Sequence, residues 1–168
     1  MTSPTPVRIR DARPGDWEAI WPFFHQIVAA GETYAYDPAM SEPEGRRTWM
    51  VAPPARTVVA TDSDGRILGT ANMYANRGGR GSHVASASFM VDPQQGGRGV
   101  GRALGEHVIE WARGNGFRAI QFNAVVETNQ AAVGLWRSLG FGVVGTVPEA
   151  FDHPRHGYVG LLIMHRFV

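Results

Sequence analysis

The sequence predicts a mixed α/β fold in one domain that spans residues 1–168. Three observations support this fold class. Strand-like runs alternate with amphipathic stretches at helical spacing. A length of 168 residues suits a single hydrophobic core. A content of 43% hydrophobic and 18% charged residues is typical of a globular chain. The expected order of elements is β-α-α-β-β-β-α-β-α-β-β, which gives a mixed sheet with helices around it.

The N-terminal half is expected to contain both helices and strands. Its elements, in order, are a strand over 7–10, a helix from 17, a loop over 31–38, a helix ending at 49, strands over 57–61 and 67–74, and turns at 62–65 and 76–81. Asp16 is the expected cap of the first helix, since short polar side chains accept hydrogen bonds from the first free N–H groups. Ser41 and Glu44 have the spacing of a capping box, which predicts the start of the second helix.

The C-terminal half alternates strands and helices. Its elements are a strand over 82–91, a helix over 99–114, a turn at 115–116, a strand over 118–126, a helix over 129–139, a strand over 142–147, a loop over 148–156 and a strand over 157–166. Asp152, His153 and His156 give that loop a loose metal-ligand composition, but the loop carries prolines and offers no convincing further ligand. We therefore expect no metal site.

The most informative segment joins the strand over 82–91 to the helix over 99–114. Between Gly96 and Arg102 it consists of glycine, arginine and a single valine. Glycines at a strand-to-helix turn allow positive φ angles and leave no Cβ to hold a ligand away from the backbone. Several N–H groups then point in one direction, with the positive end of the helix dipole behind them. The segment predicts a pocket for a phosphate or a diphosphate.

Two common glycine-loop motifs do not fit this segment. A Walker loop requires a lysine, and all 16 basic residues of the chain are arginine. The dinucleotide fingerprint Gly-x-Gly-x-x-Gly would end at Arg102 if it began at Gly97, and at Leu104 if it began at Gly99. Both registers lack the last glycine, so the phosphate belongs to another kind of ligand.

Residues 96–101, Gly-Gly-Arg-Gly-Val-Gly, resemble the acyl-CoA diphosphate loop of the GNAT acetyltransferase superfamily, Gln/Arg-x-x-Gly-x-Gly/Ala. Gly99 and Gly101 match its two glycines, whereas Gly96 stands where the family has glutamine or arginine. A second family motif, Asn-x-x-Ala-x-x-Leu-Tyr-x-x-x-Gly-Phe, resembles residues 129–141, with Trp136 in place of the tyrosine. The two motifs lie in the family's order.

The resemblance implies a mixed, mostly antiparallel sheet flanked by helices, in which two strands splay apart and bind acyl-CoA between them. It implies acetyl-CoA as the acyl donor and no metal. It assigns the donor contacts to residues from the two motifs and the strand before them: Phe89, Met90, Val91, Gly97, Arg98, Gly99, Val100, Gly101, Arg102, Asn129, Ala132 and Trp136. In this assignment the N–H of Met90 faces the thioester carbonyl as an oxyanion donor, and Trp136 packs against the pantetheine arm.

The resemblance also implies direct attack of a neutral amine on the thioester, a step that needs a base. Many relatives have a glutamate in the strand before the glycine loop, and this chain has none between Ser82 and Met90. Glu32 and His83 are the candidate bases. Glu32 lies in the loop expected to roof the acceptor pocket, and His83 lies at the start of the strand.

The departing thiolate needs a proton, or it leaves unprotonated. The family's tyrosine falls on Trp136, and an indole N–H does not release a proton at neutral pH. Tyr158, Tyr34, Tyr36 or a water molecule are the candidate acids.

Segments at 31–38, 81–85 and 121–126 resemble the phosphinothricin acetyltransferase-like branch of the superfamily. This implies a small, amino-acid-like acceptor with a primary amine. Two alternatives stay open. One is a protein or peptide N-acetyltransferase, and the other is a non-catalytic acyl-CoA-binding sensor, which the missing glutamate and tyrosine motivate.

Composition excludes several classes of function. The chain has no cysteine, which excludes disulfides, thiolate metal sites and a cysteinyl acyl intermediate. A net charge of +1 gives no electrostatic reason to expect nucleic-acid binding. No apolar run reaches membrane-spanning length, and the first residues lack a basic region followed by an apolar one, so we expect a cytoplasmic protein without a membrane partner. The oligomeric state stays open, a homodimer included.

Overall fold

The computed structural model describes residues 6–168. Its strands are β1 (Arg8–Asp11), β2 (Arg56–Thr61), β3 (Ile67–Ala75), β4 (Val84–Val91), β5 (Ala119–Val126), β6 (Gly142–His153) and β7 (Gly157–Phe167). Its helices are α1 (Trp17–Ala30), α2 (Glu42–Trp49), α3 (Val100–Gly114) and α4 (Gln130–Ser138), with short 3-10 turns at η1 (Pro14–Asp16), η2 (Gly79–Gly81) and η3 (Pro93–Gln95). The predicted order of strands and longer helices is confirmed.

Within residues 6–168 the strands form one sheet in the order β1-β2-β3-β4-β5-β7-β6. All neighbouring strands are antiparallel except β4 and β5, which run parallel. The expected mixed, mostly antiparallel sheet is therefore confirmed.

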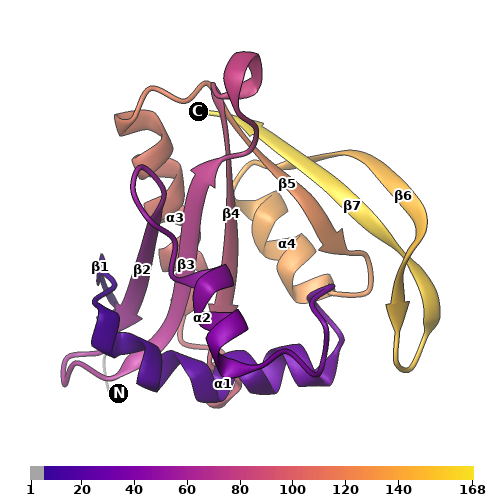
Figure 1. Cartoon of the computed structure of the whole chain (residues 1–168). Coiled ribbons are helices and arrows are strands. Elements are labelled where there is room, and N and C mark those ends of the chain that lie inside the picture. Colours follow the sequence, from indigo (N-terminus) through magenta and orange to yellow (C-terminus); the bar gives the residue numbers. More distant parts are fainter. Residues whose placement is uncertain (1–5) are drawn as a thin grey trace, which may run out of the picture.

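Helices cover both faces of the sheet (Figure 1). On one face α1 and α2 form an aromatic cluster around Trp17, Phe24 and Trp49, all of which are buried. On the other face α3 and α4 bury a larger cluster that includes Leu104 and Trp136. Burial of each such side chain contributes about 1.5–3 kcal/mol relative to leaving it in water. The two clusters therefore pack against opposite faces of the sheet, and both include residues of β4.

β4 and β5 share only a short parallel ladder, which begins with Val84 opposite Ala119. Beyond this ladder the two strands separate (Figure 1). β4 continues along β3 as far as Val91. β5 instead follows β7, past a bulge between Phe122 and Val125. The sheet therefore contains the V-shaped opening that the family resemblance implies.

β6 is longer than the sequence predicts, and this corrects the expected loop over 148–156. Pro148 has no N–H to donate, and proline is rare in central strands. β6 lies at the edge of the sheet, and its register with β7 shifts before pairing resumes at Phe151. The proline falls in this irregular stretch, so the strand continues to His153.

His153 closes the hairpin between β6 and β7. It is buried, and its Nδ1 accepts the N–H groups of Arg155 and His156 at 3.1 and 3.3 Å. The imidazole ring of His153 thus stabilises the turn between β6 and β7. In the described part of the chain no three His, Cys, Asp or Glu side chains are grouped to hold a metal ion. Among the helices of residues 6–168, none combines the length and the apolar character needed to cross a bilayer.

Asp16 does not cap α1, which corrects a further prediction. Because η1 precedes the helix, the backbone of Asp16 is already helical, with φ −67° and ψ −22°, and its side chain makes no cap bond. Its carboxylate instead accepts two bonds from the Arg10 guanidinium, at 2.7 and 3.0 Å, and one from the N–H of Arg13 at 2.7 Å. The bond from Arg10 is the main cause that lowers the pKa of Asp16.

Asp16→Asn is expected to destabilise the fold in a pH-dependent way. Since the folded-state pKa is lowered, the ionised carboxylate stabilises the fold above its unfolded pKa of about 3.9, and this contribution disappears as the pH falls through the lowered value. We expect a loss of about 1 kcal/mol in the free energy of unfolding at pH 7, measured by urea denaturation.

Asp64→Asn is the matched control, because the exposed side chain of Asp64 makes no hydrogen bond within residues 6–168. It should change the free energy of unfolding by less than about 0.5 kcal/mol. An Asp16→Asn effect that is the same at neutral pH and at about pH 2 would contradict the ionic role of Asp16.

Candidate functional site

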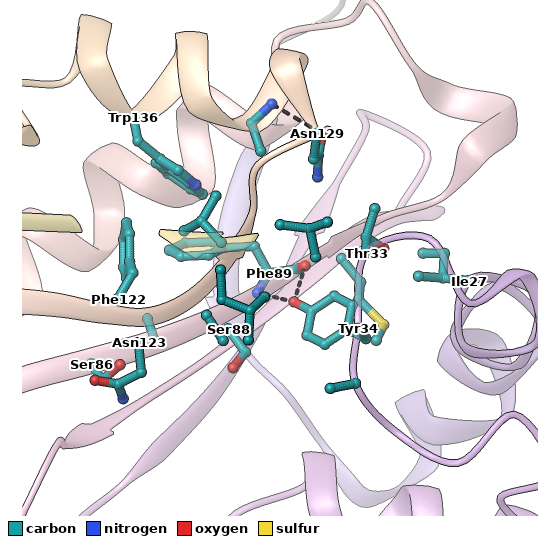
Figure 2. A pocket seen from close by; sticks show the side chains of 18 of the residues that line it. Ile27, Thr33, Tyr34, Ser86, Ser88, Phe89, Phe122, Asn123, Asn129 and Trp136 are labelled. Carbon is teal, nitrogen blue, oxygen red and sulfur yellow. Dashed lines mark hydrogen bonds between the residues drawn. The ribbon is translucent and has the colours of Figure 1, made fainter. Parts of the chain in front are cut away.

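A cavity of about 640 Å³ lies in the V between β4 and β5 (Figure 2). Residues 86–91 of β4 form one wall and residues 122–126 of β5 another. The loop segment 33–36, between α1 and α2, and the first turns of α4 complete the enclosure. The lining is mostly apolar, and among the described residues no charged side chain contributes to it.

The cavity-facing edge of β4 carries peptide groups that no neighbouring strand satisfies. Arg118 of the chain leading into β5 donates to the carbonyl of His83, while Asn76, which follows β3, donates to the carbonyl of Val84. Peptide groups alternate sides along a strand. The N–H and C=O groups of Phe89 and Val91 therefore face the cavity, where β5 has already diverged.

The same alternation directs the N–H of Met90 toward β3, where Thr70 is its partner in register. The N–H of Asp92, on the same side, donates to the carbonyl of Leu68 in β3 at 2.9 Å. The expectation that the N–H of Met90 faces an acyl carbonyl is thus corrected. The peptide groups of Met90 therefore point away from the cavity edge on which those of Phe89 and Val91 lie, although Met90 still lines the cavity.

The peptide groups of Phe89 are satisfied by a side chain from the loop between α1 and α2. Tyr34 Oη donates to the carbonyl of Phe89 at 2.5 Å and accepts its N–H at 2.9 Å (Figure 2). The ring of Tyr34 stacks on Tyr36, with centroids 5.3 Å apart, and meets Trp49 edge-on. Trp49 Nε1 in turn donates to Thr70 Oγ1 at 3.0 Å. Burial raises the pKa of Tyr34, so its hydroxyl is protonated at neutral pH.

α4 supplies the opposite wall of the cavity. Asn129 is the N-cap of this helix, and its Oδ1 accepts the N–H of Ala132 at 3.2 Å. Asn129, Ala132 and Trp136 all line the cavity. The ring of Trp136 packs on Phe89 and Phe122 at centroid distances of 4.5 and 4.8 Å. Trp136 therefore belongs both to the core and to the cavity wall.

The glycine loop lies at the end of the cavity formed by Val91 and Leu135. A Cβ on Gly101 would lie 3.2 Å from Leu135 Cδ2 and 3.9 Å from Val91 Cγ2. Gly97 and Gly99 have φ angles of 77° and 75°, which L side chains rarely adopt. Within the described residues the N–H groups of 97–102 donate no hydrogen bond. They are free to bind an anion at the start of α3.

Both arginines of the loop are held by neighbouring polar side chains. Arg98 donates to Gln95 Oε1 at 2.6 Å. Arg102 donates to Ser138 Oγ, at the end of α4, at 2.6 Å and to Glu106 Oε1 at 3.4 Å. Their exposed positive charges therefore stay beside the free N–H groups.

Of the predicted acid and base candidates, Tyr34 and Tyr36 line the cavity, whereas Glu32, His83 and Tyr158 lie outside the lining. Glu32 adjoins the lining segment 33–36, and its carboxylate pairs with Arg155 of the β6–β7 hairpin at 2.7 Å. His83 is exposed just before β4. Tyr158 is 70% exposed in β7. The structure thus brings Glu32 to the edge of the cavity and leaves His83 and Tyr158 away from its lining.

Two serines of β4 that the sequence analysis did not assign, Ser86 and Ser88, lie with Asn123 at the end of the cavity far from the glycine loop. Asn123, at the bulge of β5, donates to Asn76 Oδ1 at 2.6 Å and accepts from Gln121 Nε2 at 2.9 Å. The sequence signal that could have identified the two serines is their alternation with apolar residues in β4.

Comparison with known proteins identifies the family. The profile of the Acetyltransferase (GNAT) family matches residues 18–141, which include both walls of the cavity and the glycine loop. The chain belongs to this family. The GNAT fold and the acetyltransferase class that the two motifs imply are therefore confirmed.

Three relatives of this GNAT chain are informative. A GCN5-related N-acetyltransferase from Kribbella flavida has a similar structure, with a TM-score of 0.94 and 62% identity, over 96% of this chain and 98% of that one. The L-methionine sulfoximine/L-methionine sulfone acetyltransferase of Pseudomonas paraeruginosa is 32% identical over 147 residues, which are 84% of this chain and 83% of that protein. A phosphinothricin acetyltransferase from Sinorhizobium meliloti, solved in complex with AcCoA, shares the fold with a TM-score of 0.85 and 23% identity, over 96% of this chain and 88% of that one.

Proposed function

We propose that this GNAT enzyme transfers an acetyl group from acetyl-CoA to the primary amine of a small, amino-acid-like acceptor by direct attack. The observation that carries the proposal is the cavity between β4 and β5, which ends at the free N–H groups of residues 97–102. The family match and the AcCoA bound to the Sinorhizobium meliloti relative support it.

The donor's diphosphate is assigned to residues 97–102, because glycines and a helix N-terminus present N–H groups without an intervening Cβ. From there the pantetheine arm follows the edge of β4. Val91 offers the first cavity-facing peptide group, and the next one, that of Phe89, is held by Tyr34 Oη. The facing wall of this channel consists of three residues of α4: Asn129, Ala132 and Trp136.

The acceptor is assigned to the far end of the cavity, near Ser86 and Asn123. Tyr74 lies opposite Ser86 in the β3–β4 pairing and lines the same end. The name of the Pseudomonas paraeruginosa relative describes amino-acid-like acceptors, which supports an acceptor of this size. A cavity of about 640 Å³ suits the acyl arm together with one small molecule.

In the proposed reaction the amine nitrogen attacks the acyl carbon, and the carbonyl electron pair moves onto oxygen. Collapse of this adduct forms the amide and expels the thiolate, whose pKa of about 8.5 makes it a fair leaving group. The proton lost from nitrogen goes to water, because no charged side chain among the described residues lines the cavity.

Release of free thiol from acetyl-CoA, followed across a panel of amino acids, small amines and peptides, tests the proposal. We expect turnover with small primary amines. Activity confined to peptides would indicate a protein or peptide N-acetyltransferase. Binding of acetyl-CoA without thiol release from any amine would indicate a sensor and contradict the proposal.

The pH profile is expected to follow the acceptor. Because only a neutral amine attacks, kcat/KM should rise about tenfold per pH unit below the pKa of the acceptor amine and level off above it. Two acceptors with different amine pKa values should therefore give two different inflection points. A shared inflection would instead indicate a base on the enzyme. Glu32→Gln and His83→Ala would then identify it, with Glu18→Gln, at an exposed carboxylate of α1 outside the cavity lining, as the control.

A further inference from the structure

The reaction proposed above places negative charge on the acyl oxygen, and this charge needs a hydrogen-bond donor. The N–H of Met90 is directed to β3 and does not reach the cavity. On the cavity edge of β4, the N–H of Phe89 is already engaged by Tyr34 Oη. The N–H of Val91 also faces the cavity, but it lies next to the glycine loop and is assigned to the pantetheine arm. The remaining candidate for the oxyanion donor is Tyr34.

We propose that the hydroxyl of Tyr34 is the oxyanion donor of this enzyme. This inference rests on the proposed function, since it concerns the acyl carbonyl of the donor. Within residues 6–168, Tyr34 is the one side chain whose hydroxyl is hydrogen-bonded to the cavity edge of β4. Figure 2 shows this hydroxyl directed at the backbone of Phe89, below the ring of Trp136.

The hydroxyl can change its acceptor without any movement of the ring. Its oxygen accepts the N–H of Phe89 at 2.9 Å, and its proton is donated to the carbonyl of the same residue at 2.5 Å. Rotation of the proton about the C–O bond redirects the donor into the cavity, while the bond from the N–H is kept. That N–H polarises the hydroxyl and makes it a stronger donor.

The switch is favoured in the transition state rather than in the ground state. The carbonyl of Phe89 and the thioester carbonyl are both neutral acceptors, so the resting hydroxyl gains little by turning. A developing oxyanion forms a charge-assisted bond, which is stronger than the bond to the Phe89 carbonyl. An interaction gained only in the transition state raises kcat rather than lowering KM.

The surroundings fix the ring of Tyr34 in advance. It stacks on Tyr36 at an interplanar angle of 18° and meets Trp49 at 78°. Trp49 is buried and bonded to Thr70 of β3. Such a held donor needs no reorganisation at the moment of reaction. Tyr34 keeps its proton throughout: the carbonyl pair moves onto oxygen, returns as the amide forms, and the carbon–sulfur bond breaks.

Tyr34→Phe tests the proposal, because it keeps the ring stack and removes only the hydroxyl. We expect kcat to fall about 100-fold or more, with the KM for acetyl-CoA within about twofold of the wild-type value. Rates are normalised to the folded fraction from thermal denaturation, so that partial unfolding cannot imitate a catalytic effect. Calorimetric titration with coenzyme A checks that the donor site is intact.

Ser63→Ala is the control for loss of a hydroxyl, since Ser63 is exposed in the turn between β2 and β3 and does not line the cavity. It should leave kcat unchanged. Equal kcat values for Tyr34→Phe and the wild type would overturn the proposal. Tighter binding of acetyl-CoA to Tyr34→Phe at unchanged kcat would also overturn the proposal. It would mean that the hydroxyl of Tyr34 only occupies the Phe89 peptide group until acetyl-CoA displaces it. A wild-type enzyme that releases no thiol would instead refute the proposed function itself.

Discussion

Gly99→Val is expected to weaken the binding of coenzyme A roughly 100-fold or more. Gly99 is the N-cap of α3 and has a φ of 75°. A β-branched residue resists this left-handed conformation, so the loop must turn and its N–H groups diverge. Each charge-assisted bond to the diphosphate contributes about 1.5–3 kcal/mol. Loss of two such bonds lowers the affinity roughly 100-fold or more, a change that isothermal titration calorimetry resolves.

Gly96→Val is the matched control within the same loop. Gly96 has φ −60° and ψ 154°, which any L residue adopts. A Cβ there would meet only the Pro93 carbonyl oxygen, at 3.9 Å. We expect affinity close to that of the wild type. Unchanged affinity in Gly99→Val would refute the assignment of residues 97–102 to the diphosphate.

Trp136→Ala is expected to have the largest effect on stability. Its buried ring contacts Phe89 and Phe122, and its Cζ3 would lie 2.9 Å from a Cβ on Gly105. Removal of the ring leaves a cavity that the packed α3–α4 interface cannot close. Large aromatic-to-alanine changes in cores cost about 3–5 kcal/mol. In a domain of this size that cost lowers Tm by roughly 6–20 °C.

Differential scanning calorimetry measures this loss, and acetyl-CoA affinity should fall with it because Trp136 also forms the cavity wall. Val144→Ala is the control, since Val144 is an apolar residue that is 69% exposed on the edge strand β6. Its free energy of unfolding should change by less than about 0.5 kcal/mol. A loss below about 1 kcal/mol in Trp136→Ala would mean that the ring is not a core element.

Features that depend on neighbours in the chain were predictable. The glycines of the loop reflect a local backbone requirement, and the left-handed φ angles of Gly97 and Gly99 meet that expectation. Gly101 is present for a different reason, because Leu135 leaves little room for a side chain there.

Errors arose where a distant partner overrides a local rule. The sequence predicts that Asp16 caps its own helix, but Arg10 of β1 binds its carboxylate. The sequence predicts that a strand ends before Pro148, but pairing with β7 resumes beyond it at Phe151. The prediction for the N–H of Met90 is wrong because strand alternation fixes the direction of that N–H only once the pairing of β4 is known.

The sequence by itself determined the order of elements, the glycine turn before α3 and the family, because each follows from local conformational preference or from residues a few positions apart. The tertiary structure alone decided where β4 leaves β5, which edge of β4 faces the cavity, and that Tyr34 bonds Phe89 across 55 positions of the chain. The physical reason is that these features depend on strand pairing and on contacts between segments distant in sequence. Local propensity carries no information about which segments meet.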